Sequence, residues 1–226
     1  VAGTHGKSTT AGMLGKTLQE IDDSSFMTGA VLQHENTNFH VGDGHYFVFE
    51  GDEYKALHDD PIPKMHQYKA DILLLTNLEF DHPDIFESLE EMQDEFRQLI
   101  AALPTDGLAV HNADNVSLAM LMHETNIGQV SFGLHNPADF RATNLRAGED
   151  GTTFDVVWTK QGLAEPITET YNIHLFGDIN VYNALGVIAL LRTLGFNEAE
   201  QVQDGLSSYY GVKRRFELIG EKNGVT

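Results

Sequence analysis

Small residues, a lysine and several hydroxyl side chains stand together near the start of the sequence, in "GTHGKSTT" at residues 3–10. Glycines allow backbone N–H groups to wrap around a triphosphate, a lysine reaches its β- and γ-phosphates, and a serine or threonine hydroxyl holds Mg²⁺. Gly6, Lys7 and Ser8 form the G-K-[ST] core of this pattern, although its first glycine would fall where Val1 stands. These residues indicate a nucleotide-binding loop.

Acidic residues and a histidine follow two apolar runs later in the chain. The run "YFVF" at residues 46–49 leads into Glu50, and "ILLL" at residues 72–75 leads towards "LEFDHPD", which contains His82. In open α/β sheets, ligands bind beyond the carboxyl ends of the strands, and Mg²⁺ prefers oxygen ligands. Solvated loop residues are the alternative interpretation in so acidic a chain, but the positions of Glu50 and His82 favour a metal site.

A helix should follow the nucleotide-binding loop, because a helix N-terminus offers free N–H groups and a positive dipole end to phosphate. Apolar residues do recur at helical spacing after the loop, at Ala11, Leu14, Leu18 and Ile21. A strand should also precede the loop, but only Val1 and Ala2 could belong to it. We therefore expect the chain to be the middle part of a longer protein.

Short apolar runs alternate with amphipathic stretches over the first 136 residues. The runs are residues 46–49, 72–75, 108–110 and 130–132. The clearest helical stripe comprises Leu89, Met92, Phe96 and Ile100. Nearly continuous apolar strands that alternate with helices are typical of a parallel sheet covered on both faces.

The pattern changes after residue 136. "FRATNL", "TTFDVVW" and "ITETYNIHL" look like antiparallel strands with a turn at residues 148–151, and two helices follow, at residues 181–194 and about 198–210. We therefore predict a single α/β domain of the P-loop type over residues 1–226. It should have a mostly parallel sheet flanked by helices, with a small antiparallel sheet appended.

The composition restricts the classes of function. The 226 residues are 41% hydrophobic, and 34 acidic against 14 basic residues give a net charge of −20. Such acidity argues against a nucleic-acid surface, which needs clustered Lys and Arg, and against docking on anionic lipid. Cysteine is absent, and no apolar run approaches the ~20 residues of a membrane span. We expect a cytoplasmic enzyme, without membrane insertion and without nucleic acid as a partner.

Five segments together resemble a known family. They are "GTHGKSTT", "EGDEY", "TNLEFDHPDIF", "GDINVYNAL" and "VKRRFE". In this order they resemble the central ATP-binding domain of the Mur ligases, over essentially the whole chain. The resemblance implies that ATP phosphorylates a substrate carboxylate and that an amine then attacks the acyl phosphate to form an amide. Such chemistry depends mostly on positioning and charge neutralisation, since the transferring phosphoryl group spreads its charge over several oxygens.

The resemblance also implies roles for individual residues. Lys7 would steady the phosphates, Ser8 and Glu50 would hold one Mg²⁺, and His82 would lie at a second metal site. Arg215, in "VKRRFE", would contact phosphate as the domains close. The cradle for the triphosphate would comprise Gly3, Thr4, His5, Gly6, Lys7, Ser8 and Thr9.

Three asparagines are further candidates. "GDINVYNAL" resembles a family motif of the form G-x-H-N-x-x-N, which would place Asn180 and Asn183 at the nucleotide, where their amides suit an adenine edge. Ile179 replaces the histidine of that motif, and helix capping is the alternative role for the two asparagines. Asn38 falls in a stretch that resembles the family's muramyl-binding region, although turn formation is the more common role for such a residue.

The expected substrates follow from the same resemblance. The best match is the branch of the family that joins L-alanine to UDP-N-acetylmuramate. His5 is typical of that branch and also of the branch that adds a preformed murein tripeptide. An N-terminal domain that binds the UDP-sugar and a C-terminal domain that closes over ATP would lie outside this chain and contact it. A nucleotide-binding regulatory module without ligation is the alternative outside the family.

Overall fold

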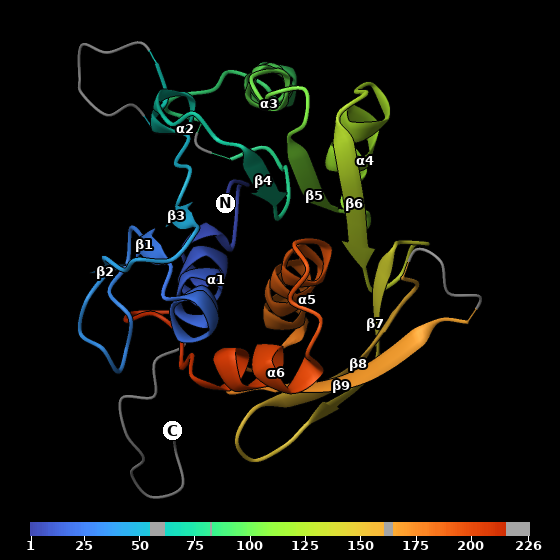
Figure 1. The fold of residues 1–226 in the computed structure, drawn as a ribbon. Coiled ribbons are helices and arrows are strands. Elements are labelled where there is room, and N and C mark those ends of the chain that lie inside the picture. The colour runs from blue at the N-terminus through green and yellow to red at the C-terminus, as the bar shows by residue number, and fades with distance from the viewer. Residues whose placement is uncertain (55–61, 82, 161–164, 216–226) are drawn as a thin grey trace, which may run out of the picture.

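The computed structural model describes residues 1–54, 62–81, 83–160 and 165–215 (Figure 1). Its main sheet has six strands in the order β4, β5, β6, β7, β8, β9. β4 to β7 are mutually parallel, and β8 and β9 are each antiparallel to the preceding strand. The strands are β4 (Ile72–Leu75), β5 (Leu108–Asn112), β6 (Gly128–Gly133), β7 (Phe140–Ala147), β8 (Thr152–Trp158) and β9 (Ile167–Ile173).

The parallel part of the sheet arises from the predicted apolar runs. Leu73, Leu74, Ala109 and Val110 are all buried, so β4 and β5 are covered on both faces. Nearly continuous apolar strands suit such a position. In β8, by contrast, every second residue is fully buried, which is the pattern of a strand with one covered face.

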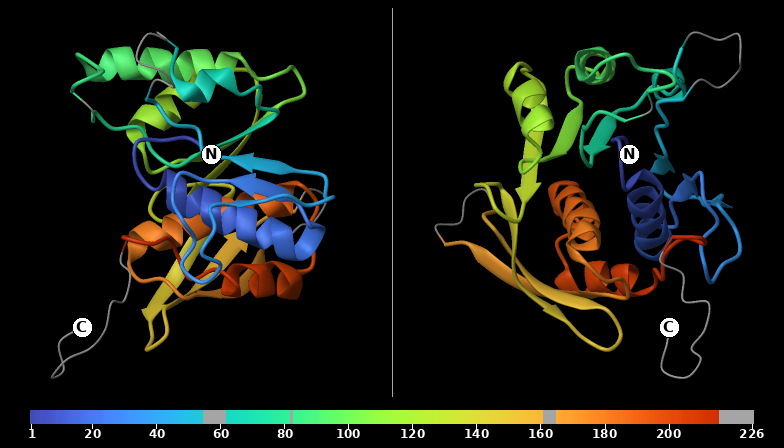
Figure 2. Two further views of the ribbon diagram at one scale, coloured as in Figure 1. Left: turned by 90° about the vertical axis from the view of Figure 1, so that its left-hand side faces the viewer. Right: turned by 180° about the vertical axis from the view of Figure 1, so that it is seen from behind.

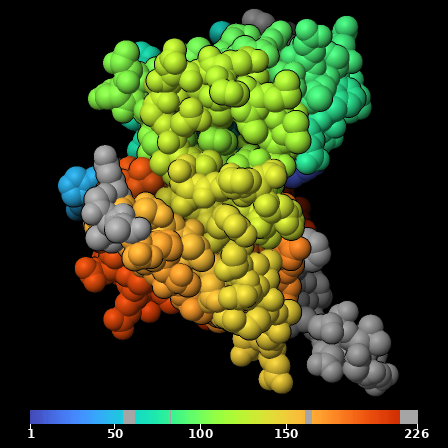
Figure 3. All heavy atoms as spheres, turned by 90° about the vertical axis from the view of Figure 1, so that its right-hand side faces the viewer, coloured from blue at the N-terminus to red at the C-terminus, as the bar shows by residue number. Residues whose placement is uncertain are grey.

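The predicted antiparallel strands are present, but they extend the main sheet instead of forming an appended one. β7 pairs with β6 through Phe132–Phe140 and Gly133–Arg141, so the sheet continues from its parallel into its antiparallel part. Figure 3 shows this side of the molecule, where yellow-green residues adjoin the yellow and orange residues of the antiparallel part. The predicted turn is confirmed, since the Gly148 N–H donates to the Gly151 carbonyl oxygen at 2.8 Å.

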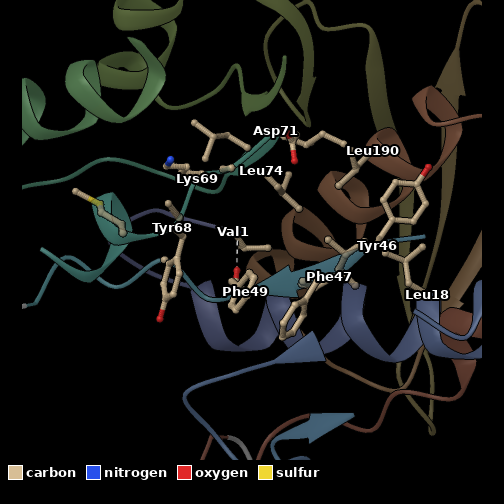
Figure 4. Close-up of a pocket in the computed structure, with 18 of the residues that line it drawn as sticks. Val1, Leu18, Tyr46, Phe47, Phe49, Tyr68, Lys69, Asp71, Leu74 and Leu190 are labelled. Carbon is tan, nitrogen blue, oxygen red and sulfur yellow. Dashed lines mark hydrogen bonds between the residues drawn. The ribbon is translucent and has the colours of Figure 1, made fainter. Parts of the chain in front are cut away.

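A second sheet has three strands in the order β2, β1, β3. These are β1 (Ser25–Met27), β2 (Phe39–His40) and β3 (Phe47–Phe49). Val1 and Ala2 lie between this sheet and the main one. The Val1 nitrogen donates to the Phe49 carbonyl oxygen at 2.8 Å, and the Ala2 nitrogen donates to the Leu74 carbonyl oxygen at 2.9 Å. These two residues therefore bridge β3 and β4, with Ala2 paired in parallel with Leu75, at the place where the sequence predicts the end of a strand. Figure 4, a close-up of the pocket at this place, shows Val1 between Phe49 and Leu74.

Helices cover both faces of the main sheet (Figure 2). On one face, the helices pack on a core that includes Leu74, Val110 and Phe132. These helices are α1 (Lys7–Asp22), α5 (Asp178–Thr193) and α6 (Ala199–Ser207). α5 lies at the centre of this layer, in contact with α1, α6 and strands β4 to β8 (Figure 1).

The other face of the sheet carries a separate core, which includes Leu73 and Leu75. Its helices are α2 (Lys64–Gln67), α3 (Leu89–Ala101) and α4 (Val116–His123). The predicted stripe of α3 is confirmed at Met92, Phe96 and Ile100, which are buried there. None of the helices in the described ranges is long and apolar enough to span a bilayer.

The two C-terminal helices are where the sequence predicts them, with shifted ends. α5 begins at Asp178 instead of residue 181, because Gly177 at φ +85° turns the chain into the helix before the apolar run starts. α6 ends at Ser207 instead of residue 210. Helix ends are set by such local turns, which hydrophobic periodicity does not report.

Candidate nucleotide-binding site

The glycines of the loop before α1 fit between the end of β4 and the start of α5. Gly3 and Gly6 have φ of +140° and +81°. A Cβ atom on Gly3 would lie 2.1 Å from Thr76 Oγ1, and one on Gly6 would lie 2.7 Å from Asn183 Oδ1. Both positions therefore require glycine, for the backbone conformation and for the space. Gly6 is the N-cap of α1, so the free N–H groups of the helix open onto the loop.

The two residues that follow β4 hold this loop in place. Asn77 Oδ1 accepts a hydrogen bond from the His5 N–H at 2.8 Å, and Asn77 Nδ2 donates to the His5 carbonyl oxygen at 3.1 Å. Thr76 Oγ1 donates to the same carbonyl oxygen at 2.7 Å. The loop is thus fixed to the sheet by side chains that sequence analysis did not single out. Their position directly after an apolar strand is the signal that could have identified them.

The Lys7 ammonium group lies inside the loop. Its Nζ donates to the carbonyl oxygens of Gly3 and Thr4 at 2.8 and 3.0 Å. It also lies 2.9 and 2.8 Å from the two carboxylate oxygens of Glu53, whose residue is only 1% exposed. A lysine held in this way projects its charge to the place where a bound phosphate would meet the helix N-terminus.

Ser8 and Glu50 form the second polar contact of the site. Ser8 Oγ donates to Glu50 Oε1 at 2.7 Å, and the Gly29 N–H donates to Glu50 Oε2 at 2.6 Å. The structure thus brings together the hydroxyl and the carboxylate that the sequence predicts at the metal. A hydroxyl and one carboxylate suit Mg²⁺, which usually completes its shell with phosphate oxygens and water.

The predicted second metal site is described only in part. His82 lies outside the described residues. The His5 ring lies beside this segment, with its nitrogens 4.0 Å from Glu79 Oε2 and 3.9 Å from Asp81 Oδ2. Within the described ranges, no group of three or more His, Cys, Asp or Glu side chains is arranged to hold a metal. Of the side chains that the sequence predicts at a metal, the described residues bring together Ser8 and Glu50.

Asn180 and Asn183 are both buried at the start of α5. Asn183 Nδ2 donates to Asn180 Oδ1 at 3.3 Å, and Asn180 Nδ2 donates to the Phe176 carbonyl oxygen at 2.8 Å. The N-cap of α5 is Gly177, and it is not capped by a side-chain hydrogen bond. The two asparagines therefore connect α5 to its own preceding turn and, through Asn183, to the phosphate loop.

A pocket of about 200 Å³ adjoins these asparagines. It opens at the carboxyl edge of the main sheet, where α5 meets the loops after β4 and β5. Ile179, which replaces the histidine of the family motif, contributes an apolar wall. The other lining residues are Thr76, Asn77, Glu79, Asn112, Asp114, Asn115, Phe132, Tyr182 and Asn183. The mixture of amides and apolar groups is suitable for a planar polar ring.

Asp114 organises the far side of this pocket, and sequence analysis missed it. Its carboxylate accepts from the backbone N–H groups of residues 134–136, at distances of 2.6 to 3.0 Å, and from the Tyr182 hydroxyl at 2.8 Å. Burial alone would raise the pKa of Asp114, but these donors together hold the pKa below its usual value. Burial and the contact with Asp114 raise the pKa of Tyr182. The pair therefore stays as carboxylate and phenol at neutral pH.

The remaining candidates lie around the small sheet. Asn38 Nδ2 donates to the Thr28 carbonyl oxygen at 3.0 Å, in the turn that joins β1 and β2. Arg215 is the last described residue, and its side chain is exposed. The segment just before it pairs with the loop after β1 through Leu32 and Val212. That loop includes Gly29, so the chain that carries Arg215 passes near the Glu50 side of the site.

Thr9 lies in the first turn of α1 and is half-buried.

This arrangement of strand end, glycine loop, partly buried lysine and helix N-terminus defines a P-loop nucleotide-binding domain. A family model described as the Mur ligase middle domain matches residues 1–191. The chain therefore belongs to the Mur ligase family.

Three relatives illustrate the relationship. UDP-N-acetylmuramate–L-alanine ligase of Rhodospirillum rubrum is 34% identical over 229 residues, which cover 100% of this chain and 46% of that protein. The crystal structure of the UDP-N-acetylmuramate-alanine ligase of Thermotoga maritima has a TM-score of 0.76 at 25% identity, covering 98% of this chain and 46% of that one. A Neisseria UDP-N-acetylmuramate:L-alanyl-gamma-D-glutamyl-meso-diaminopimelate ligase also has a TM-score of 0.76, at 30% identity over 94% of this chain and 65% of that one. The chain spans about half the length of the named sequence relatives.

Proposed function

We propose that this chain is the ATP-binding part of a ligase that joins L-alanine to UDP-N-acetylmuramate in the cytoplasm. The observation that carries the proposal is the arrangement of Lys7, Ser8 and Glu50 around the N-terminus of α1. It occurs in a chain that is 34% identical to a ligase named for that reaction. The net charge of −20 is consistent with small-molecule substrates and not with a nucleic acid.

In the proposed reaction, the residues of this chain would position the reacting groups and neutralise the charge of the phosphates. Residues 3–9 would cradle the triphosphate, with Lys7 on the β- and γ-phosphates. Ser8 and Glu50 would hold Mg²⁺, which would neutralise the phosphate oxygens, and His82 would serve a second metal site. A substrate carboxylate oxygen takes the γ-phosphoryl group while ADP leaves, and the amine then displaces phosphate to form the amide. Such alignment of reacting groups supplies much of the rate in phosphoryl transfer.

The pocket beside α5 is the proposed adenine site. Asn183 lies against the phosphate loop and lines the pocket, and Asn180 fixes the orientation of its amide. Arg215 would reach the phosphates from the segment that passes near Glu50. Asn38 would lie on the sugar side, where its contact with Thr28 shapes the turn. The domains that bind the UDP-sugar and close over ATP would contact this chain from outside it.

A second candidate within the family is supported by one comparison. The Neisseria structure with a TM-score of 0.76 is named for a ligase that uses a tripeptide, and its 30% identity is in the same range as that of the L-alanine ligases. The nucleotide site is compatible with either amine, because the groups that would select the amine lie elsewhere. A regulatory module that binds ATP without ligation is the candidate from another class.

The first experiment measures Mg-ATP binding by calorimetry for the 226-residue chain and for its Lys7→Ala variant. We expect weak binding that falls at least tenfold in the variant, the equivalent of about 1.4 kcal/mol. The matched control is Lys16→Ala, which removes a lysine of the same helix that pairs with Glu20 and Glu35. This control should bind Mg-ATP like the parent chain. Equal affinity in all three proteins would contradict the assignment of the phosphate loop.

The second experiment distinguishes the candidate reactions. The chain within its full-length protein is assayed for ADP release with UDP-N-acetylmuramate and either L-alanine or the tripeptide. The proposal predicts product with L-alanine, and product with the tripeptide alone would favour the second candidate. Mg-ATP binding with neither product would leave the regulatory module as the better interpretation.

A further inference from the structure

The pocket beside α5 has a single accessible aromatic ring on its wall, within the described part of the chain. Phe132 and Tyr182 are the aromatic residues that line it. Phe132 is 1% exposed and belongs to the core under α5, whereas Tyr182 is only half-buried. The pocket volume of about 200 Å³ is below the roughly 300–1,000 Å³ of sites that enclose a whole drug-sized ligand. The pocket therefore suits one planar group, such as a base, that is attached to a larger molecule.

The amides that line the pocket are already engaged within the protein. Asn77 exchanges two hydrogen bonds with the His5 backbone, at 2.8 and 3.1 Å. Asn112 Oδ1 accepts from the Asp114 N–H at 2.9 Å, and Asn112 Nδ2 donates to the Thr76 carbonyl oxygen at 3.1 Å. Much of their hydrogen-bonding capacity is thus used to hold the loops. Contact with the apolar faces of the pocket should therefore supply a large share of the affinity for an occupant.

The side chain of Tyr182 is held at both ends. Its Cα belongs to α5, and its hydroxyl donates to Asp114 Oδ2 at 2.8 Å. Asp114 is itself fixed, because its carboxylate accepts from the backbone N–H groups of residues 134–136. A ring that is fixed before the ligand arrives loses little conformational freedom on binding, which favours affinity.

The position of Tyr182 on α5 relates the ring to the phosphate loop. Ile179, Tyr182 and Asn183 are three and four residues apart, so they share one face of the helix, and all three line the pocket. Asn183 lies against Gly6 of the phosphate loop. A molecule whose phosphates are bound by that loop would thus have its attached ring within reach of Tyr182.

We propose that the ring of Tyr182 is the surface on which the base of the bound nucleotide stacks, and that Asp114 is a positioning residue that holds this ring. The inference rests on the adenine site proposed above, and it identifies the side chain that contacts the face of the base. Stacking of a base on an aromatic side chain contributes about tenfold or more to affinity.

Calorimetry on the full-length protein tests the role of Tyr182 with two ligands, Mg-ATP and Mg-tripolyphosphate, which has no base. Tyr182→Leu keeps an apolar side chain but removes the ring, and it should lower the Mg-ATP affinity by about tenfold or more. Its affinity for Mg-tripolyphosphate should stay within about twofold of the parent. Tyr182→Phe restores the ring without the hydroxyl, so its Mg-ATP affinity should be clearly higher than that of Tyr182→Leu.

A double-mutant cycle tests the role of Asp114. Asp114→Asn should weaken Mg-ATP binding in the parent but much less in the Tyr182→Leu background, where no ring remains to be positioned. Mg-tripolyphosphate binding should be unchanged by Asp114→Asn in both backgrounds. Equal losses of Mg-ATP affinity in the two backgrounds would overturn the positioning role of Asp114.

The outcomes separate this inference from the proposed function. Lys7→Ala should weaken the binding of both ligands. If it does, and Tyr182→Leu binds Mg-ATP like the parent, the base lies elsewhere and the stacking proposal is overturned while the phosphate loop stands. Equal loss of both ligands in Tyr182→Leu would overturn it as well, by making Tyr182 a structural residue of α5. A parent protein that binds neither ligand would contradict the proposed function itself, and the stacking proposal with it.

Discussion

Lys7 and Glu53 form a partly buried ion pair at the base of the phosphate loop, with Nζ 2.8 Å from Oε2 and 2.9 Å from Oε1. The Lys7 side chain is 12% exposed and the Glu53 side chain 1%. Glu53 lies after β3 and Lys7 opens α1, so the pair connects the small sheet to the nucleotide site. A buried carboxylate therefore compensates the lysine charge before any phosphate arrives.

Double-mutant analysis of this pair should reveal strong coupling. Glu53→Gln and Lys7→Met each remove one charge of this pair, whereas the double variant removes both charges. We expect a coupling energy of about 1–3 kcal/mol from urea unfolding of the four proteins. Additive losses would show that the two charges do not stabilise each other. Mg-ATP should stabilise Glu53→Gln more than the parent chain, because phosphate supplies the missing negative charge.

Glu50→Gln should raise the Mg²⁺ concentration for half-maximal ATP binding by roughly tenfold, about 1.4 kcal/mol. The amide keeps the size of the side chain and its contact with Ser8, but it removes the charge that Mg²⁺ prefers. The matched control is Asp52→Asn in the same loop, whose carboxylate contacts Lys64 at 3.1 Å. Titration of Mg²⁺ at constant ATP measures both variants. An unchanged Mg²⁺ midpoint for Glu50→Gln would show that the Glu50 carboxylate of the parent chain does not bind Mg²⁺ and only contacts Ser8.

Gly6→Ala should destabilise the loop more than an equivalent change elsewhere. Alanine at a left-handed position costs about 1–2 kcal/mol, and here its Cβ would also lie 2.7 Å from Asn183 Oδ1. Gly195→Ala is the control, since Gly195 has φ +96° with no atom within 4 Å of the added Cβ. Both variants should lose stability in thermal unfolding, but only Gly6→Ala should also lose Mg-ATP affinity. Equal effects on binding would show that the Gly6–Asn183 contact is unimportant.

His111 should make the fold sensitive to mild acid. Burial within β5 lowers the pKa of His111, against a weaker opposite effect of Asp139. The pKa of His111 is therefore near 6.5 in the unfolded chain and lower in the folded chain. Below pH 6.5 the unfolded chain binds a proton that the folded chain does not, so the free energy of unfolding falls as the pH drops. Urea unfolding between pH 8 and pH 5 measures the slope. His111→Gln should flatten the profile, and an unchanged slope would assign the sensitivity to other groups.

The parts of this site that could be predicted from sequence are those that depend on local chemistry. Gly6, Lys7 and Ser8 are adjacent, and the conformation they need is a property of their own backbone. Glu50 is a candidate from the sequence because the end of an apolar strand can be recognised without knowing its neighbours, and the structure places its carboxylate against Ser8. The strands of the main sheet were predicted for the same reason, since burial on both faces requires a continuous apolar run.

The parts that could not be predicted depend on which strands become neighbours. The contacts of Thr76 and Asn77 with His5 exist only because Val1 and Ala2 lie beside β4. The joining of β7 to β6 rests on two residue pairs at the strand ends, which alternation within either strand does not indicate. Apolar patterns define how each strand is covered, but they do not define the order in which strands pair.

The central position of α5 has a consequence for biosynthesis. The helix lies near the end of the described chain, yet it contacts α1 and most strands of the main sheet. During synthesis on the ribosome, the phosphate loop emerges long before Asn183, which packs against Gly6. The surroundings of the loop are therefore complete only after α5, which ends at residue 193, has been synthesised and can dock. Its contacts with the loop are distant in sequence and slow to form. A nascent chain that stalls before α5 would present the glycine loop, but not yet a nucleotide site.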